Sequence, residues 1–172
     1  MKKLLLLSFI AIFGLSNAQI KFGVNAGLAT NFANLKADKY KTKDNHSGFY
    51  AGVFSEIGVP LLPLKIQPAV NYVHITDAHS YIQVPVMLKY YFIPKLNFQA
   101  GPQIAFMLDG IASSSSINRT NFGLGFGFGA DIIAGLMAEA RYAVQLNNTF
   151  KSPADGEKLH FNILNIGVGY KF

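Results

Sequence analysis

The chain has 172 residues, enough for one domain, and no cysteine, which excludes a disulfide-stapled scaffold and a cysteine-ligated metal site. Half of the residues, 51%, are hydrophobic and only 14% are charged, which is too apolar for an ordinary water-soluble domain. The formal net charge is +6; without Lys2 and Lys3, which lie in a leader segment, 13 basic residues against 9 acidic ones leave +4. This excess is too small to indicate a nucleic-acid-binding protein.

The first 18 residues have the pattern of a secretory signal peptide. A basic start precedes the apolar run Leu4–Leu15, and small residues precede a cleavage position after Ala18. A transmembrane helix needs about 20 apolar residues, and this run is shorter. We therefore expect residues 1–18 to be cleaved and residues 19–172 to form the mature domain.

From residue 20 onward the chain alternates between apolar residues and polar or small ones with period two, the pattern of β-strands. The clearest case is the segment in which Phe122, Leu124, Phe126 and Phe128 alternate with glycines. Eight such segments are expected, at residues 20–30, 48–58, 64–75, 80–92, 96–108, 121–132, 135–146 and 159–172.

The lengths of the segments and their connections indicate a membrane barrel. Most segments have about ten to thirteen residues, the length that a tilted strand needs to cross the hydrocarbon layer. Eight strands with both ends on one side need three connections there and four on the other. The sequence fits, with short turns at 59–63, 93–95 and 133–134 and polar loops at 31–47, 76–79, 109–120 and 147–158. The sequence therefore predicts an all-β fold, an eight-stranded antiparallel up-and-down transmembrane β-barrel.

A soluble β-sandwich or barrel also alternates, but 14% charged residues would not cover its outer surface. In the membrane fold the apolar face contacts lipid and the polar face fills an interior just wide enough for side chains. We expect the charges on the polar face to be paired inside the barrel in a structural role, with Glu139 and Arg141 at the centre. The expected members are Glu56, Lys65, Lys89, Asp131, Glu139, Arg141 and Lys171.

Three prolines lie on consecutive predicted strands at a spacing of 17 residues: Pro68, Pro85 and Pro102. Proline removes a hydrogen bond from the ladder between strands and is usually confined to edges or bulges. We expect these positions to be bulges or points of curvature in the wall.

The last segment, LNIGVGYKF, ends on aromatic residues that follow alternating apolar ones. Tyr170 and Phe172 are therefore expected to form the signal that the outer-membrane barrel assembly machinery reads, with periplasmic chaperones as further transient partners.

Several stretches resemble the PorT-like family of small outer-membrane β-barrels of Bacteroidetes. This likeness implies an outer-membrane location and an eight-stranded barrel, but no uniform activity. The sequence departs from the family at Ala69, where the resemblance leads us to expect a glutamate, so the interior charges are expected to be rearranged there. The resembling stretches are Phe49–Glu56, Leu64–Pro68 with Tyr72, Tyr81–Phe92, Ala100–Pro102, Phe122–Asp131, Arg141 with Tyr142, and Tyr170–Phe172.

Catalytic chemistry has weak support in the sequence. His74, Asp77, His79 and Ser80 lie together near one loop, but a short hairpin lacks the surrounding groups that would orient metal ligands or a catalytic histidine. We assign no catalytic, cofactor-binding or metal-binding residue.

The sequence therefore predicts a non-enzymatic outer-membrane protein with a structural or surface-interaction role, in contact with membrane lipids and lipopolysaccharide. Three alternatives remain open. They are an accessory component of a secretion or gliding apparatus, a lipid hydrolase or acyltransferase that uses His74 or His79, and a small-solute pore.

Overall fold

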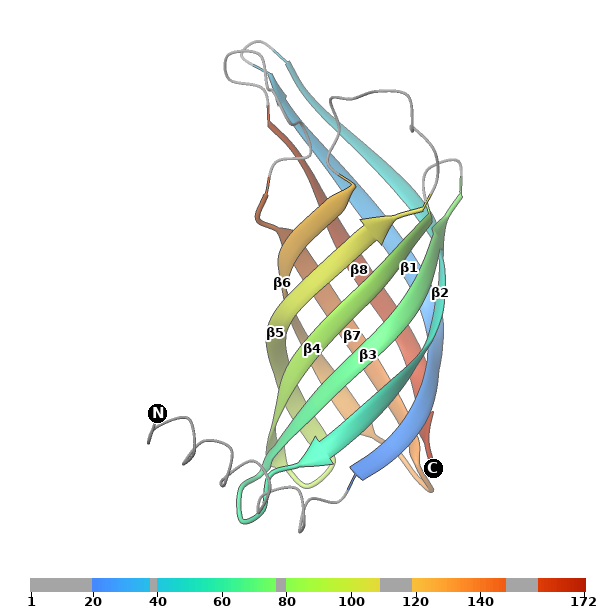
Figure 1. Ribbon diagram of the computed structural model, residues 1–172, viewed down its shortest axis with the longest axis vertical. Helices are drawn as coiled ribbons and strands as arrows, with labels where there is room; N and C mark the ends of the chain where they lie inside the picture. Colours follow the sequence, from blue (N-terminus) through green and yellow to red (C-terminus); the bar gives the residue numbers. More distant parts are fainter. Residues whose placement is uncertain (1–19, 38–39, 77–79, 109–118, 148–157) are drawn as a thin grey trace, which may run out of the picture.

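The computed structural model describes residues 20–37, 40–76, 80–108, 119–147 and 158–172, which form a closed barrel of eight antiparallel strands (Figure 1). Each strand pairs with the next, and β8 closes the barrel by pairing with β1. This confirms the predicted fold; the predicted signal peptide lies outside the described residues. No helix in the described part of the chain is long and apolar enough to span a membrane. The strands are β1 (Ile20–Ala37), β2 (Tyr40–Gly58), β3 (Leu64–Ile75), β4 (Ser80–Ile93), β5 (Leu96–Met107), β6 (Thr120–Asp131), β7 (Leu136–Gln145) and β8 (Lys158–Lys171).

Six of the strands begin and end within a residue or so of the predicted positions, but the first predicted loop, 31–47, is wrong. β1 and β2 stay paired from Ile20↔Ile57 to Ala37↔Tyr40, and β8 pairs with β1 as far as Lys36↔Lys158. The remaining strands stop earlier, so β8, β1 and β2 form a three-stranded projection, visible at the top of Figure 1. Only strand segments in contact with lipid need alternating apolar residues. Backbone hydrogen bonds between strands do not require that alternation, so β1 and β2 continue beyond it.

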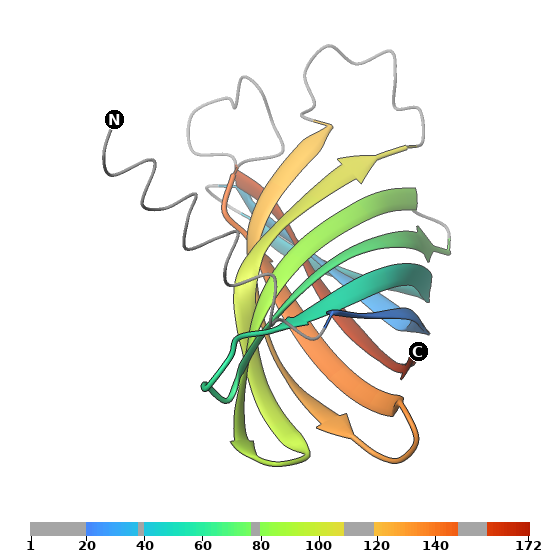
Figure 2. The ribbon, with the colours of Figure 1, turned by 60° about the horizontal axis from the view of Figure 1, so that its bottom comes forward.

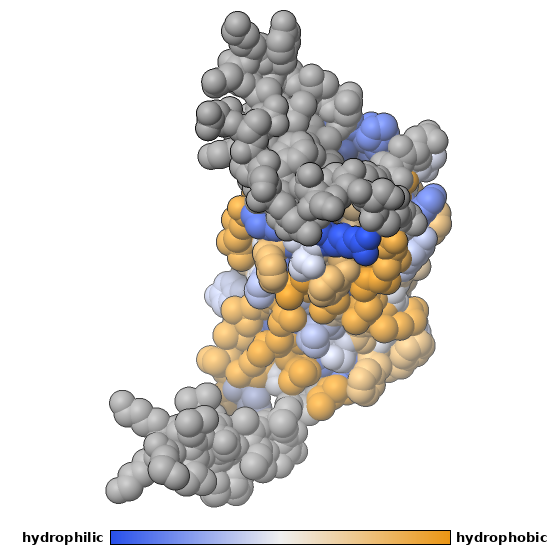
Figure 3. All heavy atoms as spheres, turned by 45° about the horizontal axis from the view of Figure 1, so that its top comes forward, coloured by the Kyte–Doolittle hydropathy of each residue, from blue (hydrophilic) through white to orange (hydrophobic). Residues whose placement is uncertain are grey.

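The two faces of the wall follow the alternation in the sequence. Outward side chains such as Leu28 and Phe128 are 70% and 64% exposed, while their neighbours Ala29 and Gly127 are buried. Figure 3 shows the outward residues as a broad apolar surface on the visible side of the barrel. A face of this kind is stable against lipid, and closure of the barrel leaves no strand edge without a partner.

The two ends of the barrel differ, and we name them by their connections. At the turn end lie the short connections 59–63, 94–95 and 132–135, together with the start of β1 and the end of β8 (Figure 2). At the loop end lie the projection and the connections after β3, β5 and β7. In outer-membrane barrels the short turns face the periplasm and the longer loops face outward.

The three prolines interrupt the pairing between neighbouring strands without changing the strand register. Pairing skips Pro68 in the β2–β3 ladder, Pro85 in the β3–β4 ladder and Pro102 in the β4–β5 ladder, together with one neighbouring residue each. The register is the same on both sides of each interruption, so no residue is inserted and the predicted bulges are wrong. The one recorded register shift within the described strands lies between Tyr91 and Ile93. A proline nitrogen carries no hydrogen, so each proline cannot donate a backbone hydrogen bond to the strand that precedes it in the barrel.

The interior packs in layers. Near the loop end lies an apolar cluster, which we call the upper cluster: Ala29, Tyr50, Val73, Ile75, Tyr81 and Met107. Near the turn end a smaller cluster contains Phe54, Ala69 and Met137. Ala69, at the position of the expected glutamate, thus lies against apolar side chains. Polar and charged side chains fill the space between and below these clusters.

Tyr50 fits inside the barrel because two glycines, on β1 and β8, leave room for its side chain. Gly27 of β1 pairs with Gly167 of β8. A Cβ atom at Gly167 would lie 2.5 Å from the Tyr50 hydroxyl, and one at Gly27 would lie 2.8 Å from the ring. Both distances are too short for real atoms, so these two positions require glycine while Tyr50 occupies the lumen.

Candidate functional site: the charged interior

Lysines from three strands converge on the carboxylate of Glu56 near the turn end. Lys65 Nζ lies 2.7 Å from Glu56 Oε1, Lys89 Nζ lies 3.5 Å from Oε2, and Lys171 Nζ lies 3.4 Å from Oε1. Lys171 also pairs with Asp131 at 2.8 Å. The strand alternation places all five side chains on the inner face, and cross-strand neighbours bring them to one level.

Two residues that the sequence did not identify take part in this group. The Tyr91 hydroxyl donates to Asp131 Oδ2 at 3.2 Å, and its ring lies 4.4 Å from Lys65 Nζ. Met137 Sδ lies 3.9 Å from Lys89 Nζ. Both residues occupy inward positions in the alternation. A tyrosine or methionine at such a position does not by itself indicate that its side chain contacts a charged group.

The pair formed by Glu139 and Arg141 lies next to the lysine group, because the charges of Glu139 and Lys89 interact. Arg141 Nη2 donates to Glu139 Oε1, and Asn25 Nδ2 approaches the same oxygen at 3.5 Å. Both charged side chains are buried. The structure therefore brings the seven expected residues together, with Glu56, rather than the Glu139–Arg141 pair, receiving most of the ion pairs.

Uncharged amides fill the lumen beside these charges, since Gln99 lies opposite Lys89 in the β4–β5 ladder and Asn165 lies opposite Arg141 in the β7–β8 ladder. Asn165 Nδ2 donates to Gln83 Oε1 at 3.0 Å. Gln67, Asn71 and Gln99 have 0% exposure, and their amide atoms have no hydrogen-bond partner among the described residues. These amide side chains are therefore polar groups that solvent does not reach.

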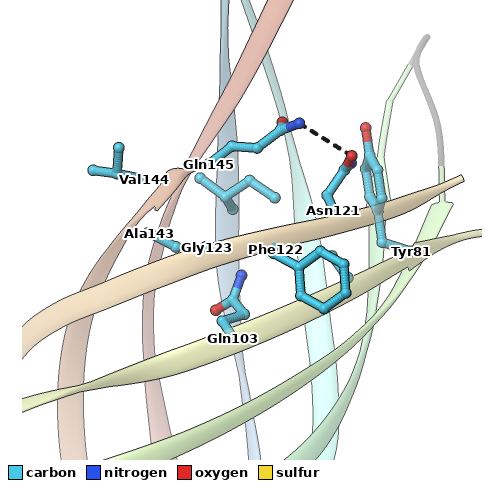
Figure 4. A pocket seen from close by; sticks show the side chains of 10 residues that line it. Tyr81, Gln103, Asn121, Phe122, Gly123, Ala143, Val144 and Gln145 are labelled. Atoms are coloured by element: carbon cyan, nitrogen blue, oxygen red, sulfur yellow. Dashed lines mark hydrogen bonds between the residues drawn. The ribbon is translucent and has the colours of Figure 1, made fainter. Parts of the chain in front are cut away.

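A small hollow lies near the loop end, between β4, β5, β6, β7 and β8 (Figure 4). Its volume is about 20 Å³, room for about one water molecule. Gln145 Nε2 donates to Asn121 Oδ1 at 3.1 Å along its edge, and Tyr81 lies beside Asn121. The hollow is too small for an organic substrate.

The residues considered for catalysis come together only in part. His74 Nδ1 and Ser80 Oγ are 3.1 Å apart, and the Tyr72 hydroxyl donates to Ser80 Oγ at 3.3 Å. The His74 ring packs against Phe49, with 5.4 Å between ring centroids. Asp77 and His79 lie outside the described residues. Within the ranges that the structure describes, no group of three or more histidine, aspartate or glutamate side chains is arranged to hold a metal ion.

Tyr170 and Phe172 lie on the outer face at the turn end. Their ring centroids are 5.6 Å apart with nearly perpendicular planes, and the backbone N–H of Phe172 donates to Phe22 O at 2.8 Å. Both side chains are exposed on the lipid-facing side, where a protein that guides strand insertion can reach them.

A match that spans nearly the whole sequence identifies the family of this chain. Residues 4–172 match the family model of the outer membrane protein beta-barrel domain. The chain belongs to this family. The protein is therefore an integral β-barrel of the bacterial outer membrane, with its turn end at the periplasmic side.

Solved structures of outer-membrane barrels share the fold. Neisserial surface protein A has 16% identity and a TM-score of 0.53, with 88% of this chain and 97% of that chain covered. Ail of Yersinia pestis, in a complex with the heparin analogue sucrose octasulfate, has 15% identity and a TM-score of 0.50, with 88% and 99% covered. At these identities the similarity concerns the fold alone. No curated protein matches the sequence.

Proposed function

We propose that this protein is a non-enzymatic surface protein of the outer membrane that does not conduct solutes. The observation that carries this proposal is the complete burial of lumen side chains. Asn71, Gln83 and Gln99 have 0% exposure, whereas the side chains that line a water-filled channel are exposed to it. The upper cluster and the ion pairs around Glu56 also fill the lumen.

Conductance in planar lipid bilayers tests the absence of a pore. We expect the purified barrel to give no stepwise current, with a 16-stranded porin as the positive control in the same bilayer. Reproducible single-channel steps from the folded protein would support the pore instead. Replacement of Tyr50 and Tyr81 by alanine opens the upper cluster and shows whether such steps pass through the lumen.

We propose that the surface role resides in the projection of β8, β1 and β2, which extends beyond the other strands at the loop end. Its register places Lys36 opposite both Lys41 and Lys158. The sequence of the described projection contains more lysines than aspartates, and such an excess of positive charge favours an anionic partner. The phosphates of lipopolysaccharide have the matching charge and lie at this side of the membrane.

Shortening of the hairpin tests this role. Phe32 and Asn45 are paired, so an Asn-Gly turn between them closes the hairpin in register. We expect the shortened barrel to fold and to lose binding to lipopolysaccharide micelles. Replacement of Arg119, an exposed residue at the same end, by glutamine serves as the control for loss of charge. Undiminished binding by the shortened barrel would dismiss the projection as the site.

Within the family, we propose a PorT-like branch on the strength of stretches such as Tyr81–Phe92 and Phe122–Asp131. This branch implies a role beside a secretion or gliding apparatus. A deletion strain with unchanged protein secretion and gliding would remove that role. The catalytic alternative rests on the His74–Ser80 contact. Alanine at His74 and His79 with unchanged membrane lipid composition would dismiss it.

A further inference from the structure

A second, larger hollow lies at the turn end, beside the connection between β6 and β7. Its volume is about 440 Å³. Figure 2 brings this end of the barrel forward, with the β6–β7 turn next to the end of β8. Charged residues line one side of the hollow: Lys21 at the start of β1, Lys95 before β5, Asp131 at the end of β6 and Lys171 at the end of β8.

The lysines at this hollow exceed the carboxylates. Lys171 is already paired with Asp131 and Glu56. Lys95 Nζ donates to the carbonyl of Ile132 at 3.4 Å, and no carboxylate of the described residues forms an ion pair with Lys95 or Lys21. At the hollow itself, three lysines, Lys21, Lys95 and Lys171, lie with one acidic side chain, Asp131. An excess of cations in a partly enclosed site favours a bound anion.

The other side of the hollow is apolar and faces outward. Ile133 and Phe172, which line it, are 72% and 73% exposed, and Ile132 and Leu136 lie beside them. A free inorganic anion gains nothing from this apolar side. A phospholipid has both parts, a phosphate for the lysines and acyl chains for the apolar side chains. The turn end lies at the periplasmic leaflet, where phospholipid headgroups are present at the same depth.

We propose that this hollow binds the phosphoryl headgroup of an anionic phospholipid of the periplasmic leaflet. Lys21 and Lys95 supply the charge that no protein carboxylate takes up, and Lys171 is held in place by Asp131. Ile133 and Phe172 contact the upper part of the acyl chains. This site is separate from the surface role at the loop end, since the two lie at opposite ends of the barrel.

The absence of tryptophan in the chain makes a fluorescence test possible. The variant Ile133→Trp places a single tryptophan at the hollow, and Phe122→Trp places one on the outer wall near the loop end. Each protein is reconstituted in phosphatidylcholine vesicles that contain equal amounts of brominated phosphatidylglycerol or brominated phosphatidylcholine. We expect the anionic brominated lipid to quench Ile133→Trp more strongly, and both lipids to quench Phe122→Trp equally.

Charge removal links the preference to the lysines. A lysine near an anionic lipid contributes about five-fold in affinity, so Lys21→Gln with Lys95→Gln lowers the preference more than about ten-fold, toward equal quenching. Arg119→Gln, which removes an exposed charge at the other end, leaves the preference unchanged. Heat-dependent migration in gels checks that every variant is folded.

Three outcomes would overturn the proposal. Equal quenching of Ile133→Trp by the two lipids would show no selective site. A preference that persists without Lys21 and Lys95 would show that these residues do not form it. Binding of inorganic phosphate in calorimetry, together with equal quenching by the two lipids, would show that the site takes free phosphate rather than a lipid. None of these results depends on lipopolysaccharide binding, so this site and the proposed surface role fail separately.

Discussion

Glu56 is the residue on which the interior charges of the turn end depend. It accepts ion pairs from Lys65, Lys89 and Lys171, and its side chain is only 2% exposed. Loss of its charge leaves three ammonium groups close together, with Asp131 paired to Lys171 and the charge of Glu139 acting on Lys89.

We therefore expect Glu56→Gln to lower the free energy of unfolding by about 3–5 kcal/mol. Urea unfolding of the barrel in vesicles measures this change. Arg119→Gln, on the exposed rim, is the control and should stay within about 0.5 kcal/mol. A loss for Glu56→Gln no larger than that of the control would mean that water already screens the lysines.

The Glu139–Arg141 pair gives a second prediction at the residue scale. Arg141→Met removes the ion-pair partner of the buried Glu139 carboxylate, which keeps Asn25 and the more distant charge of Lys89, and should cost about 3–5 kcal/mol. Glu139→Leu together with Arg141→Met removes both charges and should restore most of that loss. A double-mutant cycle on unfolding free energies measures the coupling. Additive losses would show that the two side chains do not stabilise each other.

At the scale of strands, close approach at the β1–β8 seam makes Gly167 intolerant of a side chain. A Cβ there meets Tyr50 and the backbone carbonyl of Ala26. We expect Gly167→Ala to cost about 1–3 kcal/mol in urea unfolding. Gly125→Ala is the matched control, because a Cβ at Gly125 meets the flexible end of Met87 at 3.4 Å. Similar losses at both glycines would contradict the crowding.

The end of β8 carries the proposed assembly signal. Tyr170 and Phe172 contact each other on the lipid-facing side. If the assembly machinery reads them, Phe172→Ala reduces the amount of folded barrel in outer-membrane fractions of growing cells, while refolding of the purified variant in detergent is unchanged. Reduced refolding in detergent as well would instead indicate that Phe172 stabilises the barrel itself.

Strand positions could be predicted well, and side-chain partners only partly. The lipid imposes alternation on each strand, so segments such as Leu64–Ile75 are visible in the sequence. The extension of β1 and β2 is not, because outside the hydrocarbon no apolar face is required. The predicted inward positions of Glu56 and Arg141 follow from parity, but which lysine meets which carboxylate depends on strand stagger and tilt. That stagger is set by the whole barrel, so the sequence did not predict the contacts of Tyr91 and Met137 or the central place of Glu56 among the ion pairs.

At the scale of the molecule, a closed wall and a filled interior predict cooperative unfolding. Each strand has two partners, so the barrel resists detergent until heat opens it. We expect the protein from an outer-membrane fraction to migrate faster in gels when unheated than after boiling. Identical migration of the two samples, or recovery in the soluble periplasmic fraction, would contradict the membrane barrel.

The prolines divide the wall into two parts that should respond differently to strain. Between β5 and β2, by way of β6, β7, β8 and β1, the described ladders run without a skipped pair. The ladders between β2 and β5 each lose two pairs, at Pro68, Pro85 and Pro102, along one diagonal. A closed barrel has no free strand edge at which local unfolding can begin, so we expect local unfolding to begin along this diagonal of missing pairs. Amide hydrogen exchange should accordingly start in the middle of β3 and β4, beneath the lipid, rather than at the strand ends.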